Sequence, residues 1–109
     1  MSRSRWLFAA AVVVQLVVLY APRSPSGGGV PGIDKVVHVA VFALVTWVGL
    51  RSGAPRALVV LLTVVHAPVS ELLQAVALPG RSGDAWDVVA DLGGCVVGWW
   101  AASRGRMRG

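Results

Sequence analysis

Four apolar runs divide the chain, and polar or turn-forming segments separate them. The runs cover residues 6–21, 34–50, 57–78 and 85–102. A helix needs about 17–25 residues to cross the hydrocarbon of a bilayer, so the third run is comfortably long and the others are marginal. Flanking residues that snorkel can complete a short span. The connecting segments contain glycine or proline and cannot continue a helix. The pattern predicts an all-α fold: an integral membrane bundle of four transmembrane helices, forming one domain over residues 1–109.

Composition supports lipid as the surrounding solvent. Of the 109 residues, 56% are hydrophobic and only 14% are charged, whereas a soluble domain keeps about a quarter of its residues charged. A chain this small has too little interior to bury so much apolar side chain. The net charge is +5, but the basic residues lie between apolar runs without interleaved aromatics, which argues against nucleic acid as a partner. Nine of the ten basic residues are arginine, which indicates a GC-rich bacterial source.

The basic residues predict the orientation of the bundle. Seven of the ten fall in the N-terminus, the middle loop and the tail: Arg3, Arg5, Arg51, Arg56, Arg104, Arg106 and Arg108. With four spans these segments share one side, which the positive-inside rule makes the cytoplasm. We therefore predict a multi-pass protein of the bacterial plasma membrane with both termini inside. Arg3 and Arg5 before an apolar stretch also fit a signal peptide, but the sequence around Pro22 is a poor cleavage site.

A polar stripe runs along the fourth apolar run. Its members follow steps of 3, 4, 3 and 4 residues, which place them on one helical face: Asp84, Asp87, Asp91, Gly94 and Gly98. The spacing of the two glycines is G-x-x-x-G, which lets another backbone approach closely. Because charges inside a membrane are costly, we expect this stripe to face other helices.

The second and third runs carry matching polar faces. One face of the third run holds Thr63, Ala67, Ser70, Glu71 and Gln74. In the second run, His38 lies one turn from Asp34, and Pro68 should loosen the third helix just before Glu71. Ionisable groups from three helices thus fall at similar depth, in the outer half of the membrane. This predicts an outward-facing polar site, with His66 rotated away from it to pack or to form an interhelical hydrogen bond.

Simpler roles remain open for several of these residues. Asp34, Asp84 and Asp87 lie where helices begin, and carboxylates there cap backbone amides. Lys35 is placed to snorkel, and Arg81 is also explained as a loop charge. The lone Cys95 is expected to be a small packing residue.

The ordered set of polar residues resembles the VanZ-like family of small polytopic bacterial membrane proteins. The resemblance covers residues 34–98 and rests on Asp34-Lys35-x-x-His38, on Glu71-x-x-Gln74, on Arg81 followed after five residues by Asp87, and on Asp87-x-x-x-Asp91-x-x-Gly94-x-x-x-Gly98. It implies a role in the cell envelope, since the family's namesake is associated with low-level teicoplanin resistance. It also implies His38, Glu71, Gln74, Arg81 and Asp87 as site residues, with Asp34 and Lys35 next. Asp91 stands where the family commonly has asparagine.

Three functions follow as hypotheses. The first is binding or remodelling of a lipid-linked wall precursor or lipid headgroup, which would alter susceptibility to teicoplanin-type antibiotics; Lys35 and Arg81 would hold phosphate. The second is a membrane enzyme with His38, Glu71 and Asp87 as an acid–base set or metal ligands, although no known catalytic motif supports a reaction. The third is a proton- or ion-coupled carrier. The sequence assigns no metal site and names no cofactor, and it leaves the oligomeric state open.

Overall fold

Four α-helices make up the described part of the molecule. The computed structural model describes residues 3–20, 33–77 and 85–108. Its helices are α1 (Arg3–Tyr20), α2 (Ile33–Arg51), α3 (Arg56–Ala77) and α4 (Ala85–Arg108). The all-α prediction is confirmed, and the first three helices match the apolar runs to within three residues at each end.

The fourth helix is longer than the sequence predicted. We expected it to end at residue 102, but α4 continues to Arg108. The tail contains no proline, and its arginine and methionine residues favour helix, so the lone Gly105 does not stop the helix. Helix α3 likewise continues through Pro68 to Ala77, so the expected loosening at this proline does not interrupt it.

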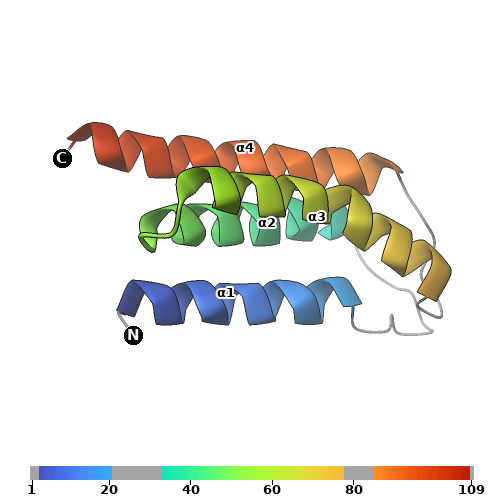
Figure 1. Ribbon diagram of the computed structural model, residues 1–109. Helices are drawn as coiled ribbons and strands as arrows, with labels where there is room; N and C mark the ends of the chain where they lie inside the picture. Colours follow the sequence, from blue (N-terminus) through green and yellow to red (C-terminus); the bar gives the residue numbers. More distant parts are fainter. Residues whose placement is uncertain (1–2, 21–32, 78–84, 109) are drawn as a thin grey trace.

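The helices lie side by side and alternate in direction (Figure 1). Helix α2 packs most extensively on α4, α1 packs mainly on α2, and the contact between α1 and α3 is the weakest. The N-terminus, the α2–α3 turn and the C-terminus share one end of the bundle, while α2 and α4 begin at the other end (Figure 1). The arginine-bearing segments named above therefore lie at one end of the bundle.

A four-residue turn reverses the chain between α2 and α3. The backbone N–H and the hydroxyl of Ser52 both donate to the carbonyl oxygen of Gly49, at 3.2 and 2.7 Å. Gly53 has a φ of +91°, a left-handed conformation that glycine adopts without a steric penalty and that commonly ends a helix. The carbonyl of Pro55 accepts the N–H of Val59 at 3.1 Å and opens α3. The turn keeps Arg51 and Arg56 at the same end.

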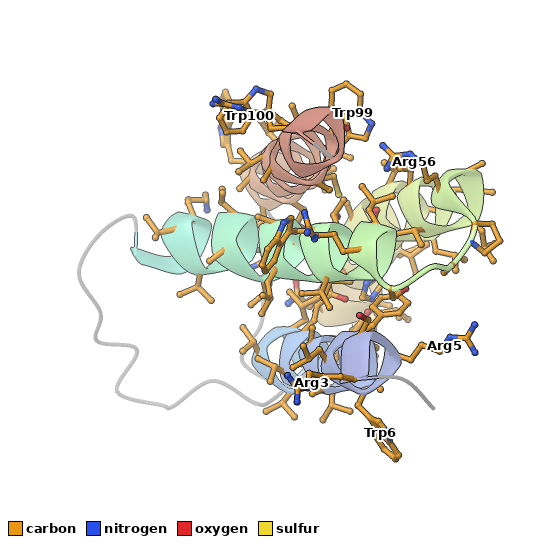
Figure 2. The ribbon with its side chains drawn as sticks, turned by 90° about the vertical axis from the view of Figure 1, so that its left-hand side faces the viewer. Arg3, Arg5, Trp6, Arg56, Trp99 and Trp100 are labelled. Carbon is orange, nitrogen blue, oxygen red and sulfur yellow. The ribbon has the colours of Figure 1, made fainter. Side chains whose placement is uncertain are left out.

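Tryptophans surround this arginine-bearing end. Figure 2 views the molecule from that side and shows Trp6, Trp99 and Trp100 pointing outward from the bundle. The guanidinium of Arg104 lies 4.9 Å from the ring centre of Trp100, within cation–π range. Aromatic rings beside basic side chains are typical of a membrane–water interface.

The two glycines of α4 permit its close packing on α2. A Cβ atom built on Gly98 would lie 2.5 Å from the carbonyl oxygen of Ala43, and one on Gly94 would collide with the carbonyl oxygen of Val39. A Cβ built on Gly93 would meet nothing within 4 Å, so this glycine does not lie against another described helix. The prediction that Gly94 and Gly98 face another helix is confirmed, and that helix is α2.

Polar side chains lie inside the bundle, and large apolar ones cover its outside. The buried polar side chains include Gln15, His38, Thr46, Thr63, Ser70, Glu71, Gln74, Asp87 and Asp91. The exposed apolar side chains include Leu7, Val17, Leu61, Leu62, Leu72 and Val76. Helices α1 and α3 are each long and apolar enough to cross a membrane. A polar interior inside an apolar exterior suits lipid surroundings, because so much apolar surface in contact with water would be unfavourable.

Candidate functional site

Four of the ionisable residues that the sequence singled out meet between α2 and α4. Nδ1 of His38 lies 2.7 Å from Oδ1 of Asp91, and Nε2 of the same ring lies 3.8 Å from Oδ2 of Asp87. Nζ of Lys35 lies 2.7 Å from Oδ1 of Asp87. We call these four residues the α2–α4 polar cluster. The prediction that the acidic stripe faces another helix is confirmed for Asp87 and Asp91, and that helix is α2.

Helical spacing and the two glycines build this cluster. Lys35 and His38 are three residues apart on α2, and Asp87 and Asp91 are four apart on α4, so each pair shares a face. Gly94 lies three residues beyond Asp91 and brings the α2 and α4 backbones together. Because aspartate is short, it reaches the imidazole only when the helices approach this closely.

The exposed fraction of the side chains increases along the cluster, from its buried end to its edge. Asp91 is 0% exposed and His38 is 2% exposed, whereas the side chain of Lys35 is 37% exposed. Oδ2 of Asp91 is buried and has no hydrogen-bond partner among the described residues. The cluster thus offers a cation near the surface and an acceptor oxygen at depth.

The protonation state of His38 controls the balance of charge. A neutral imidazole donates through one nitrogen only, whereas an imidazolium donates through both. Since both ring nitrogens of His38 face carboxylates, the protonated ring compensates Asp87 and Asp91 together. With Lys35 and His38 charged and both aspartates ionised, the four residues would be formally neutral, which lowers the cost of burying them.

Helix α3 contributes a second set of polar side chains. The face predicted from sequence is confirmed, since its buried residues are Val59, Thr63, Ala67, Ser70, Glu71 and Gln74. Nε2 of Gln74 donates to the carbonyl oxygen of Leu19 at 2.6 Å. Gln74 therefore ties α3 to the end of α1, and Glu71 is buried on the same face.

His66 is linked to α1, apart from the polar cluster. Its Nε2 lies 2.8 Å from the hydroxyl of Tyr20, and its ring centre lies 5.7 Å from that of Phe42. The predicted role as a packing and hydrogen-bonding residue is confirmed. Cys95 is also as expected: it is buried and packs in the core with Phe42 and Ala67.

Three predicted residues cannot be placed relative to the cluster. Arg81 and Asp84 lie outside the described residues, and Asp34 is in the first turn of α2 with its side chain outside them. Within the described part of the chain, no group of three or more histidine, cysteine, aspartate or glutamate side chains is arranged to hold a metal ion.

Sequence reasoning missed two polar residues of α1. Neither Tyr20, the partner of His66, nor Gln15 was singled out from the sequence. Gln15 is buried and lies one turn from both Ala11 and Leu19, the other buried residues of α1. The amide side chain of Gln15 in an otherwise apolar stretch of α1 was the signal in the sequence that could have identified it.

Comparison of the chain with protein-family models, with curated proteins and with solved structures finds no match.

Proposed function

We propose that the chain is a four-span protein of the bacterial plasma membrane, with both termini in the cytoplasm. The apolar exterior and the membrane-length helices α1 and α3 support a membrane location, and the arginine-bearing segments at one end of the bundle support this orientation. By the positive-inside rule that end is cytoplasmic. The α2–α4 polar cluster then lies toward the outer face, because α2 and α4 begin at the opposite end.

The proposed role is binding the polar headgroup of a lipid-linked cell-wall component. The observation that carries it is the cluster itself, in which a partly exposed Lys35 leads to the buried Asp87, His38 and Asp91. An ammonium at the edge suits a phosphate group, while carboxylate and imidazole groups suit the hydroxyl and amide groups of a sugar or peptide. The resemblance to the VanZ-like family agrees with this role, which would alter susceptibility to teicoplanin-type antibiotics.

Binding is tested with the full-length protein in nanodiscs. The probe is a polyprenyl-diphosphate-linked disaccharide–pentapeptide, the form in which wall units cross the membrane. We expect saturable binding that Lys35→Ala and His38→Ala each weaken about tenfold or more, since each removes a charge-assisted contact. Val89→Ala, a change at an exposed apolar position of α4, is the matched control and should bind normally. Equal binding by all four proteins would refute the role of the cluster.

A host phenotype provides the second test. Cells that express the wild-type chain should show altered teicoplanin susceptibility, and cells that express the Lys35→Ala or His38→Ala chain at equal membrane levels should not. A phenotype that survives both substitutions would show that the cluster is not responsible.

One observation favours an acid–base enzyme as the alternative. The contact between Nδ1 of His38 and Asp91 orients the ring and turns Nε2 toward Asp87, as a carboxylate orients a catalytic imidazole. Release of phosphate or of a headgroup from the same probe, lost in Asp91→Asn, would favour the enzyme. If the bound probe is recovered intact, the result favours binding without catalysis.

A further inference from the structure

A groove runs along one side of α1, from the arginine-bearing end of the bundle toward its middle. Its first part is a hollow of about 600 Å³ between α1 and the α2–α3 turn, and Arg5 and Pro55 are among its lining residues. Its second part, of about 390 Å³, lies between α1, α2 and α3 and reaches Val69. Phe8 and Val12 line both parts, so the two parts adjoin. We call them together the α1 groove.

The length of the α1 groove matches one leaflet of a membrane. Its lining on α1 extends from Arg5 to Leu16, which is about 16 Å at the rise of an α-helix. The hydrocarbon of a bilayer is about 30 Å thick, so each leaflet contributes about 15 Å. The groove begins at the end that we place in the cytoplasm, so it extends through the inner leaflet and ends near the midplane.

The chemistry of the lining changes along the groove. Arg5, at its start, is exposed, and Figure 2 shows its side chain extending outward from α1. The second part of the groove is mainly apolar. Its polar lining residues are Gln15 and Thr63, which are buried, and His66, which is bonded to Tyr20. The groove therefore offers a cation at the interface and an apolar wall at depth.

The charge around the start of the groove is positive. Residues 1–33 and 35–70 contain no aspartate or glutamate, and they include α1, the α2–α3 turn and most of α3. The guanidinium of arginine matches the geometry of a phosphate group, and basic side chains at a cytoplasmic surface attract anionic lipids. An exposed arginine at the start of an apolar groove therefore selects a ligand with an anionic head and a long apolar chain.

We propose that the α1 groove binds one anionic phospholipid of the cytoplasmic leaflet, with its phosphate at Arg5 and one acyl chain along Phe8 and Val12. Ala9 and Leu62, which line the groove, are exposed. The groove is therefore open to the bilayer, and a lipid can enter it from the side while its second acyl chain stays among the neighbouring lipids.

Other occupants fit the groove less well. A zwitterionic phospholipid carries a cation of its own, which compensates its phosphate and is repelled by the arginines. A free phosphate ion has no apolar part to fill the second part of the groove. A second copy of the chain in the same orientation would bring its own arginines to this end, and like charges opposed across an interface cost free energy.

Lipid selectivity tests the proposed ligand. The full-length protein in a neutral detergent is titrated with phosphatidylglycerol, and separately with phosphatidylcholine that has the same acyl chains. Native mass spectrometry counts the bound lipid. We expect phosphatidylglycerol to saturate at one lipid per chain and to bind about fivefold more tightly than phosphatidylcholine. Inorganic phosphate in millimolar excess should not displace it, because the ion lacks the acyl chain.

Two matched pairs of variants test the site. Arg5→Gln should weaken phosphatidylglycerol binding about fivefold, the contribution of one basic side chain near an anionic headgroup. Arg3→Gln should leave it unchanged, because Arg3 lines neither part of the groove and points in a different direction from Arg5 (Figure 2). Ala9→Trp fills the first part of the groove and should abolish the preference for phosphatidylglycerol. Ala10→Trp, at the adjacent exposed position, should bind as the wild type does.

Any of four results would overturn the proposal: equal affinity for the two lipids, displacement by inorganic phosphate, equal losses in Arg5→Gln and Arg3→Gln, or normal binding by folded Ala9→Trp. The proposal rests on the proposed membrane orientation but on none of the four residues of the α2–α4 polar cluster. Failure of wall-precursor binding would therefore leave it standing. Its own failure, in a chain whose cytoplasmic end is confirmed by labelling, would leave the proposed function untouched.

Discussion

Nδ1 of His38 on α2 lies 2.7 Å from Oδ1 of Asp91 on α4, in a contact that joins residues 53 positions apart in the chain. Both side chains are buried, so this contact fixes the register of the two helices as well as compensating charge. The G-x-x-x-G face of Gly94 and Gly98 lies directly beyond it and brings the backbones into contact. Packing and chemistry therefore depend on the same interface.

A double-mutant cycle measures the strength of this contact. His38→Ala and Asp91→Ala should show a coupling energy of about 1–3 kcal/mol, since buried partners in one network do not add independently. The measurement is unfolding in mixed micelles. A cycle between His38 and Val96, which is exposed on α4, should give coupling near zero. Additive effects for the His38–Asp91 pair would contradict the geometry.

Two glycines of α4, Gly93 and Gly98, should respond oppositely to substitution by alanine. Gly98→Ala places a methyl group 2.5 Å from the Ala43 carbonyl oxygen, and such overpacking costs about 1–3 kcal/mol. Gly93→Ala meets no atom within 4 Å and should stabilise the helix by about 0.5–1 kcal/mol, because alanine loses less entropy than glycine. Thermal unfolding of the two variants in one detergent gives the comparison. Equal destabilisation would mean that α4 packs differently.

Replacing Lys35 and replacing Asp87 should lower the free energy of unfolding by different amounts. Asp87 is buried, whereas the Lys35 side chain is 37% exposed. Lys35→Met removes the closest cation from the buried Asp87 carboxylate, which keeps only the more distant Nε2 of His38 at 3.8 Å. The loss should cost about 1–3 kcal/mol, the range for a buried group left poorly satisfied. Asp87→Leu should cost less, because the lysine can turn toward water. The measurement is the unfolding free energy of both variants. A larger loss in Asp87→Leu than in Lys35→Met would contradict the prediction.

Gln74 should act as a tether between helices. Gln74→Leu removes the donor to the Leu19 carbonyl and should lower the unfolding free energy by about 0.5–1.5 kcal/mol. Ala75→Leu, at an exposed position on the same helix, is the control and should change it little. If the two variants unfold alike, the tether contributes nothing measurable.

Sequence periodicity predicted the helices and their buried faces better than it predicted which helices pack against each other. Steps of three and four residues located the inward stripe of α4, and Gly94 and Gly98 lie against α2 as that stripe requires. A stripe identifies the face of a helix but not the helix opposite, so nothing in the sequence indicated that Gln74 would reach α1. The pairing of His66 with Tyr20 was hidden for the same reason, since it joins residues 46 positions apart. The length of α4 was missed because charged residues end an apolar run without ending a helix.

The most direct test of the account is the sidedness of the chain in living cells. In a Cys95→Ala background, single cysteines replace Ser4 and Ser103 near the arginine-bearing end, and Ser26 and Ser82 in the two linkers predicted to lie outside. A membrane-impermeant thiol reagent should label positions 26 and 82 in intact cells, and positions 4 and 103 only after permeabilisation. Labelling of position 103 in intact cells, or protection of position 82, would contradict the four-span arrangement and remove the outward-facing site with it.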